Sequence, residues 1–280
     1  MLGGIEAGGT KFICGVGTGP KDLRLAQFPT TTPDETLAVV LAFFREYRPE
    51  AVGIGSFGPL DRRPGSPTWG HITSTPKAAW RDYDLAGAVR AALGVPVAFD
   101  TDVNAAALAE ARWGAGRGLT DFIYVTVGTG IGGGAFAGGR LVHGLSHPEM
   151  GHIPVPHDRS RDPFPGCCPY HGDCLEGLAS GPALAARWGW PPESLPPYHP
   201  AWPLEAHYLA LGIQAWMCTL SPQRILLGGG VMQHAGLLDL IRAEVTSLLA
   251  GYLAPGEITA PQLGARAGVL GALALAADCL

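Results

Sequence analysis

The sequence predicts an α/β protein made of two domains, on three observations. Strand-like and helix-like segments alternate along the chain, as they do in layered α/β domains. Each half opens with a strand, a glycine-rich turn and a second strand, in GIEAGGTKFICGVG and again in DFIYVTVGTGIGGGAFAGG. The composition, with 41 glycines, 47% hydrophobic and 15% charged residues, is typical of a compact enzyme. We therefore expect two similar halves with a cleft between them.

The first half shows its elements in a regular order. LGGIEAGGTKFICGVG is expected to form two strands joined at AGGT, and LRLAQFPT a third. Leu37, Val40, Leu41 and Phe44 recur at helical spacing, which predicts a helix over residues 34–47. AVGIGSF and PVAFD are predicted strands. The alanine-rich DVNAAALAEARWG that follows favours a helix.

The second half continues the alternation around two loops. DFIYVTVGTGIGGGAFAGG predicts a pair of strands, and the Pro- and His-rich residues 154–174 predict a loop. LEGLASGPALAARWG indicates one or two helices, and PPESLPPYHPAWP must be a loop because its prolines lack amide donors. A helix over 204–219, the strand RILLGG, and helices over 235–250 and 267–278 complete the chain.

Charge, apolar runs and isolated cysteines narrow the class of protein. The formal net charge is -5 and no run of Lys or Arg stands out, so we expect no nucleic-acid partner. No apolar stretch reaches the roughly 18 residues of a membrane span, and no signal region precedes the first strand, so we expect a cytoplasmic protein. Cys14, Cys218 and Cys279 lie alone in apolar surroundings and are expected to be buried.

The turn GIEAGGTK nearly matches a phosphate-binding P-loop. Gly4 and Gly9 have the P-loop spacing, but Thr10 precedes Lys11, so the order is reversed. The backbone of Gly8 and Gly9 with the Thr10 hydroxyl is still suited to an anion, with Lys11 a less secure contact.

Two further glycine turns extend this argument to one site. VGTGIGG has the order G-x-G-x-x-G, but a strand follows where a dinucleotide-binding fingerprint needs a helix. Gly128 and Gly130, with the Thr129 hydroxyl, can instead face an anion opposite the first turn. Gly228 to Gly230 lie between a strand and a helix and are suited to nucleotide contact. Each turn alone has a plain alternative as a flexible turn.

Asp102 is the candidate catalytic group. Asp100 and Asp102 stand at the end of a predicted strand, just before a helix. Asp102 is either the N-cap of that helix or, if it faces the cleft, a carboxylate that takes the proton from an attacking hydroxyl in phosphoryl transfer. Glu110, further along the helix, is expected to lie on the surface.

A cluster of Cys and His residues predicts a zinc site. Cys168, His171 and Cys174 are separated by two residues each, and His152 is a fourth candidate upstream. Two sulfur and two nitrogen ligands fit a closed tetrahedral zinc site. Cys167 is a spare thiol able to compete with Cys168. The other histidines here have no matching spacing and are expected to be polar loop residues, namely His143, His147 and His157.

Seven motifs taken together resemble the ROK family of repressors, open reading frames and sugar kinases, and most closely its fructokinase branch. They occur in order along nearly the whole chain: GIEAGGTK, GSFGPLD, ITSTPKAAW, DTDVNAAALAE, VGTGIGGG, HPEMGH and CPYHGDCLEG. The resemblance implies an actin-like ATPase (ribonuclease H-like) fold, with ATP and a hexose in the cleft between the two domains. It places the smaller domain at 1–102, completed by a helix at about 268–280, and the larger at 103–267.

The resemblance also implies a role for individual residues. Asp102 matches the base that deprotonates the 6-hydroxyl of the sugar as it attacks the γ-phosphate of Mg-ATP. Contacts to phosphate and adenosine are expected from Gly8, Gly9, Thr10, Lys11, Gly128, Thr129, Gly130, Gly228, Gly229, Gly230 and Val231. Contacts to the sugar are expected from Gly58, Pro59, Thr101, Glu149, His152 and Glu176. Zinc would be held by His152, Cys168, His171 and Cys174, bracing the sugar pocket without taking part in the chemistry.

Two departures from many family glucokinases point to fructose. Thr101 stands where those enzymes carry Asn, and a Cys-His-Cys set replaces three cysteines in the zinc loop. We therefore expect an ATP-dependent fructokinase that acts as a homodimer. The alternatives are a kinase for glucose or mannose and a sugar-sensing regulator. A DNA-binding regulator is not expected, because the chain begins on a strand and has no basic patch.

Overall fold

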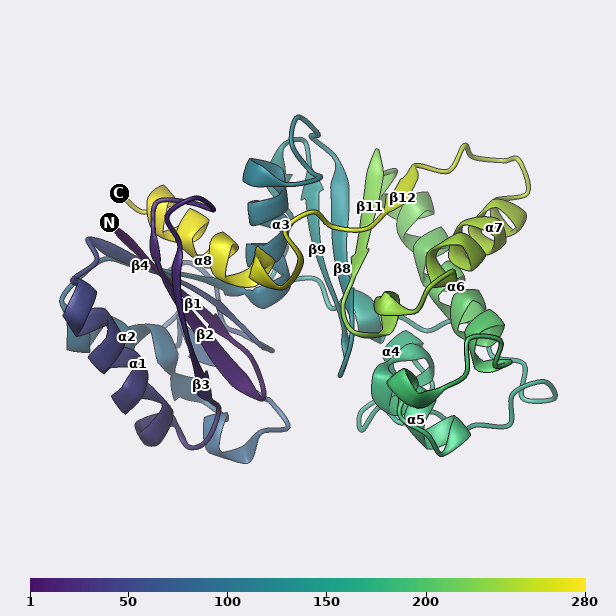
Figure 1. The fold of residues 1–280 in the computed structure, drawn as a ribbon, viewed down its shortest axis with the longest axis horizontal. Coiled ribbons are helices and arrows are strands. Elements are labelled where there is room, and N and C mark those ends of the chain that lie inside the picture. Colours follow the sequence, from purple (N-terminus) through teal and green to yellow (C-terminus); the bar gives the residue numbers. More distant parts are fainter. The chain divides into compact units, whose positions relative to one another are not determined.

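The computed structural model describes all 280 residues, and the chain folds into two compact units. The first unit comprises Met1–Gly118, Leu141–Pro148 and Gln262–Leu280, and the second comprises Leu119–Arg140 and Glu149–Pro261. Each unit holds a five-stranded sheet with helices packed against it (Figure 1). The predicted α/β class is confirmed. The domain limits given by the resemblance stay predictions.

The sheet of the first unit has the order β3-β2-β1-β4-β7. Strand β1 pairs antiparallel with β2 and parallel with β4, and β4 pairs parallel with β7. The strands are β1 (Leu2–Ala7), β2 (Lys11–Gly17), β3 (Arg24–Pro29), β4 (Ala51–Ser56) and β7 (Val97–Thr101), with the short pair β5 (His71–Ile72) and β6 (Tyr83–Asp84). The helices are α1 (Pro33–Tyr47), α2 (Leu85–Leu93), α3 (Asp102–Trp113) and α8 (Ala267–Asp278).

Helices α1 and α8 cover opposite faces of this sheet, as the alternation of side chains along β1 shows. A Cβ atom on Gly3 would lie 2.9 Å from the ring of Phe44 in α1. A Cβ atom on Gly4, the next residue, would lie 2.8 Å from the carbonyl oxygen of Val269 in α8. Successive residues of a strand point to opposite faces, so glycine is required on the second face, where helix and sheet backbones approach closely.

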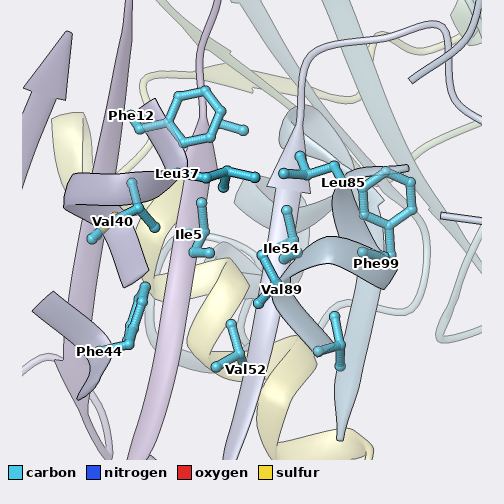
Figure 2. Close-up of a cluster of buried hydrophobic side chains, with 14 of the residues drawn as sticks. Ile5, Phe12, Leu37, Val40, Phe44, Val52, Ile54, Leu85, Val89 and Phe99 are labelled. Atoms are coloured by element: carbon cyan, nitrogen blue, oxygen red, sulfur yellow. The ribbon is translucent and has the colours of Figure 1, made fainter. Parts of the chain in front are cut away.

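The apolar core of the first unit lies between its sheet and helices α1 and α2. Figure 2 shows side chains from β1, β2, β4 and β7 meeting those of both helices. The buried members labelled there are Ile5, Phe12, Leu37, Val40, Phe44, Val52, Ile54, Leu85, Val89 and Phe99. The helical spacing seen in the sequence of α1 is thus the row of side chains that enters this core.

The sheet of the second unit repeats the arrangement in the order β10-β9-β8-β11-β12. Strand β8 pairs antiparallel with β9 and parallel with β11, and β11 pairs parallel with β12. The strands are β8 (Phe122–Val127), β9 (Ile131–Ala137), β10 (Arg140–Leu141), β11 (Arg224–Gly228) and β12 (Glu257–Thr259). The helices are α4 (Leu175–Ala179), α5 (Gly181–Trp188), α6 (Ala201–Leu220) and α7 (Leu237–Leu249).

Most predicted elements are confirmed, and the structure adds α2, β10, β12 and the β5–β6 pair. The expectation that PPESLPPYHPAWP is a loop throughout is wrong at its end, because α6 begins at Ala201 and proline is tolerated in the first turn of a helix. Two expectations about side chains are wrong. Cys218 and Cys279 are exposed, and only Cys14 of the isolated cysteines is buried. Glu110 is fully buried and accepts hydrogen bonds from the amides of Ala115 (2.7 Å) and Leu263 (2.8 Å), so it ties α3 to the segment before α8. No helix is long and apolar enough to span a membrane.

Candidate active site

The first glycine turn joins β1 to β2 and is held by backbone hydrogen bonds. The amide of Gly8 donates to the carbonyl of Lys11 (3.0 Å). Thr30 donates from its amide to the carbonyl of Thr10 (2.9 Å) and from its hydroxyl to the carbonyl of Gly8 (2.7 Å). The side chains of Thr10 and Lys11 are exposed. Thr30 therefore holds the backbone of the turn in place, and the Thr10 hydroxyl and the Lys11 ammonium group remain accessible.

Two charged residues at this turn were not identified from the sequence. The Lys77 side chain crosses over Gly9, because a Cβ atom on Gly9 would lie 2.6 Å from Lys77 Cε. Glu6, on β1, has a buried oxygen without a hydrogen-bond partner. Burial, with the negative charge of Asp102 as a smaller cause, raises the pKa of Glu6 to about 7. A second lysine and a second acid thus accompany the predicted residues.

Asp102 is the first residue of α3, and the cap of that helix is its neighbour. The hydroxyl of Thr101 accepts the amide of Asn104 (3.1 Å), so Thr101 is the N-cap. The Asp102 side chain accepts the adjacent amide of Val103 (2.8 Å). Burial raises the pKa of Asp102 to about 6. The alternative in which Asp102 is the N-cap is therefore wrong, and a carboxylate with a pKa near neutrality is left for chemistry.

Asp100 fixes the backbone on which Asp102 stands. Its Oδ1 accepts the Thr101 amide and the side-chain amide of Asn104, both at 2.8 Å. Its Oδ2 lies 3.0 Å from the Arg62 guanidinium and 2.8 Å from His143 Nε2. Asp100 is 1% exposed, so these partners satisfy a buried carboxylate. His143 lies in a loop, as expected, and its partly exposed ring joins the cluster around the buried Asp100 carboxylate.

The loop after β4, which contains Gly58 and Pro59, is held by the segment Leu141–Pro148. The Leu60 amide donates to His147 Nε2 (3.0 Å), and the Ser146 hydroxyl donates to the Leu60 carbonyl (2.7 Å). The His147 ring also lies beside Gly58, where a Cβ atom would be 3.5 Å from His147 Cε1. His147, like His143, therefore has a defined structural position that its spacing in the sequence did not reveal.

In the second unit, the predicted glycine turns come together. Gly128 donates its amide to the Gly130 carbonyl (2.8 Å) and accepts the amide of Gly181, the first residue of α5 (2.7 Å). A Cβ atom on Gly128 would lie 4.0 Å from the Gly230 amide nitrogen. Gly229 has a φ of 98° and no room for a side chain, because a Cβ atom would lie 2.2 Å from the Val127 carbonyl oxygen. The glycine turns at Gly128 and Gly230, about a hundred residues apart in the sequence, therefore lie side by side.

A cavity of about 920 Å³ opens beside these turns, entirely within the second unit. It is large enough for a nucleoside. Its walls are mostly glycine, proline and apolar side chains, with few polar groups. The lining includes Gly128, Thr129, Gly181, Ala185, Pro192, Glu193, Leu195, Pro197, Trp202, Gly230, Val231, Gln233 and His234. The predicted phosphate residues Gly128 and Thr129 and the predicted adenosine residues Gly230 and Val231 thus share one cavity.

A stacked aromatic pair forms part of the cavity wall. The rings of Trp202 and His234 lie with centroids 3.7 Å apart and planes at 9°. Trp202 Nε1 donates to the Pro196 carbonyl (2.9 Å), and His234 bonds to the backbone of Pro197. The proline-rich loop is therefore fixed to this pair. Neither the loop nor the two rings carry a sequence motif that predicts this role.

The predicted zinc ligands form one cluster. The ligand atoms of His152, Cys168, His171 and Cys174 all lie within 4.8 Å of one another. His152 Nδ1 lies 3.6 Å from both Cys168 Sγ and Cys174 Sγ, and His171 Nδ1 lies 3.7 Å from Cys168 Sγ. Zinc at about 2.3 Å from sulfur and 2.0–2.1 Å from nitrogen gives a tetrahedral sulfur–nitrogen separation of about 3.6 Å. Cys167 is exposed and lies outside the cluster.

Glu176 connects this cluster to the glycine turn. One carboxylate oxygen lies 3.8 Å from His152 Nε2, and the other accepts the amide of Ile131 (2.9 Å), next to Gly130. Glu149 immediately precedes the 3₁₀ turn Met150–His152, and its carbonyl accepts the His152 amide (3.0 Å). Of the predicted sugar contacts, His152 is therefore linked to the Glu176 side chain and to the Glu149 backbone within the second unit.

The loop of residues 154–174 is anchored by a buried ion pair. Asp162 is 3% exposed and bonds to Arg187 Nε (3.1 Å) and the Tyr208 hydroxyl (2.7 Å). His157 bonds to the Asp162 carbonyl (2.9 Å) and to the Asp173 carboxylate (3.0 Å). His157 lies in the loop, as expected, but its side chain is buried and its hydrogen bonds hold the loop together. The loop that carries the cysteines is held to α5 and α6.

Two α/β units with the same strand order, each with a glycine turn after its first strand, define the actin-like class of fold. Within that class, the chain belongs to the ROK family, which it matches over residues 2–279.

Relatives of known sequence and structure agree with this membership. The chain is 46% identical to a fructokinase of Zymomonas mobilis, covering 99% of this chain and 96% of that protein. It is 39% identical to a fructokinase of Pediococcus pentosaceus, covering 100% and 99%. It is also similar in structure to the ROK hexokinase of Thermus thermophilus, with a TM-score of 0.81, 29% identity and coverage of 99% and 98%. A ROK glucokinase of Streptomyces griseus, solved with glucose and AMPPNP, gives a TM-score of 0.80 at 29% identity, covering 99% of both chains.

Proposed function

We propose that the protein is a fructokinase that transfers the γ-phosphoryl group of Mg-ATP to the 6-hydroxyl of D-fructose. The observation that carries the proposal is its similarity to fructokinases, at 46% and 39% identity over nearly the whole chain. Its identity to a glucokinase of Streptomyces coelicolor is 28%. The substrate preferred by the more similar proteins is therefore the better expectation.

Asp102 is the proposed general base. As the sugar oxygen attacks the γ-phosphorus, the Asp102 carboxylate takes the proton of the 6-hydroxyl. The bond from the γ-phosphorus to the β,γ-bridging oxygen breaks, and ADP leaves with that electron pair. A pKa of about 6 suits a base that must be ionised at neutral pH and still accept a proton.

The proposed nucleotide contacts come from both units. The backbone of Gly8 and Gly9 and the exposed Thr10 and Lys11 side chains contact phosphate oxygens. Lys77 adds a second cation at that turn. In the second unit, Gly128, Thr129 and Gly130 contact phosphates and Gly228 to Val231 contact the adenosine. Gly230 and Val231 line the cavity that takes the nucleoside.

Glu6 fits the magnesium ion of Mg-ATP. Magnesium prefers oxygen ligands and keeps several of its waters, and the unpartnered buried oxygen of Glu6 is such a ligand or the acceptor of such a water. The bound ion would supply neutralisation of phosphate charge. Glu6 would orient it beside the first glycine turn.

The proposed sugar contacts follow the family motifs. They are Gly58, Pro59, Thr101, Glu149, His152 and Glu176. The four-ligand cluster fits zinc because its sulfur–nitrogen separations match a tetrahedral site. Burial raises the pKa of Cys174 to about 11, so its thiolate form needs a cation beside it. Zinc would hold the His152 ring in place, and Glu176 would face its other nitrogen.

A coupled assay of ADP release, run with Mg-ATP on fructose, glucose and mannose, tests the function. The proposal predicts the highest kcat/KM for fructose. Equal values for glucose and fructose would support a general hexose kinase, and sugar binding without ADP release would support a regulator. The homodimer is a further prediction, which light scattering of the purified protein checks.

A further inference from the structure

The segment Leu141–Pro148 holds the loop after β4 through hydrogen bonds to the amide and the carbonyl of Leu60. Leu60 donates its amide to His147 Nε2 (3.0 Å) and accepts the Ser146 hydroxyl at its carbonyl (2.7 Å). Leu60 is 2% exposed, so water does not replace these bonds. We call His147, Ser146 and Leu60 the latch. The latch lies directly beside Gly58 and Pro59, the proposed sugar contacts of this loop.

The hydrogen bonds of His147 define its protonation state. Nε2 accepts an amide proton, so it carries none of its own. The ring also bonds to the backbone of Pro148, and proline has no amide proton to donate. The bond to Pro148 is therefore an N–H of the ring donating to a carbonyl oxygen, which places the proton on Nδ1. Only the neutral Nδ1–H form of the imidazole satisfies both partners.

The surroundings of His147 favour this neutral form. Burial lowers its pKa below the ordinary value, with the positive charges of Arg62 and His143 acting in the same direction. The bond to Pro148 and the Asp100 carboxylate act against this shift, but they are outweighed. Protonation would place an Nε2–H against the Leu60 N–H, two donors at 3.0 Å, and would open the latch.

We infer that His147 is a positioning residue for sugar binding: its neutral imidazole holds the Gly58–Pro59 loop in place, and sugar affinity falls when the imidazole is protonated. The inference rests on the proposed function, because the loop is a sugar contact only in that proposal. Since the His147 pKa is depressed, the latch is closed at neutral pH and opens as the pH falls through that pKa. Nucleotide affinity does not depend on the latch.

Two substitutions separate the effect of the hydrogen bond to Leu60 from the effect of protonating the His147 ring. His147→Gln keeps an acceptor that can reach the Leu60 amide but does not titrate. His147→Ala leaves that buried amide without a partner, which typically weakens an equilibrium roughly five- to hundredfold. At pH 7.5 we expect the alanine variant to raise the KM for fructose by such a factor, and the glutamine variant to stay within about threefold of wild type.

The pH dependence gives the second readout. As the pH falls below the His147 pKa, the ratio of the fructose KM of wild type to that of His147→Gln should rise above its value at pH 7.5, because other titrating groups cancel in the ratio. The KM for ATP should stay the same in all variants. His207→Gln is the matched control, since His207 bonds to Glu244 (2.7 Å), has no contact with the latch residues, and should keep the wild-type pH dependence. Circular dichroism checks that each variant is folded.

Nitrogen NMR of histidine-labelled protein tests the latch without any substrate. The His147 signal, assigned by its loss in His147→Gln, should show a neutral ring protonated on Nδ1 at pH 7.5. A ring protonated on Nε2, an alanine variant with a wild-type KM, or a pH-independent KM ratio would overturn the inference. If wild type phosphorylates no hexose, the proposed function fails, while the NMR result still decides whether the latch exists.

Discussion

Asp102→Asn distinguishes a catalytic carboxylate from a structural one. A catalytic role predicts a loss of turnover with a gain in stability, whereas a structural role predicts retained turnover with a loss of stability. The substitution removes the only acid that can accept the sugar proton in the proposed mechanism. A positioned general base contributes typically 10²- to 10⁴-fold, so kcat should fall by about that factor. The fold should be retained, because Thr101 provides the N-cap of α3 and Asn can still accept the amide of Val103.

The same substitution should stabilise the fold at neutral pH. The pKa of Asp102 is about 6 in the folded chain against 3.8 for the ordinary group. The ionised carboxylate is thus disfavoured by folding, at a cost that is absent at low pH and complete above pH 6. At pH 7.5 the pKa difference corresponds to at most about 3 kcal/mol, and at pH 5 to roughly half of that. Asn carries no such cost.

Two assays check this pair of effects. Steady-state kinetics with Mg-ATP and fructose give kcat, and urea unfolding at pH 7.5 and pH 5 gives the apparent free energy of unfolding. We expect an inactive variant that is more stable than wild type by about 1–3 kcal/mol at pH 7.5, with a smaller difference at pH 5. A variant that keeps turnover within tenfold of wild type, or that is less stable at pH 7.5, would refute the reasoning.

Three further predictions concern the remaining parts of the site. The pH profile of wild-type kcat/KM should fall below pH 6 as Asp102 is protonated, and a flat profile down to pH 5 would exclude Asp102 as the base. Purified protein should contain one zinc ion per chain by metal analysis. Cys174→Ser should lower the zinc content and raise the KM for fructose. Cys167→Ser should have a smaller effect on both, because its thiol lies outside the cluster. His234→Ala should raise the KM for ATP severalfold and leave the KM for fructose unchanged, because the ring lines the cavity of the second unit; the opposite pattern would reassign the cavity.

Local pattern was sufficient to predict most of the fold. Helix α1 follows from apolar residues at helical spacing, and the strand pairs around the two glycine turns follow from their alternation with glycine. Helix α2 was not expected, although its N-cap Asp84 and its C-terminal Gly94 are ordinary helix signals. Strand β12 has only three residues and is a strand because it pairs with β11. No local pattern in the sequence predicts this pairing.

The candidate site, like the fold, was predicted from the sequence only where its pattern is local. The zinc ligands were found because their spacing is local, and three of the four lie within seven residues. The clusters around Asp100 and Leu60 were not found, because each joins segments about 40 to 90 residues apart. His143, His147 and His157 lie in loops, as the sequence predicts, but their hydrogen-bond partners are provided only by the tertiary structure. Glu110 was misjudged for the same reason, since its partners include residues about 150 positions away.

A competition experiment tests the proposed activity most directly. Equal concentrations of fructose, glucose and mannose are mixed with limiting Mg-ATP, and the phosphorylated products are identified by phosphorus and carbon NMR. The product ratio equals the ratio of kcat/KM values. We predict that fructose 6-phosphate is the main product, at least about tenfold above the other sugar phosphates, a difference of about 1.4 kcal/mol in transition-state binding. A majority of glucose 6-phosphate, or phosphorylation of fructose at a position other than the 6-hydroxyl, would contradict the account.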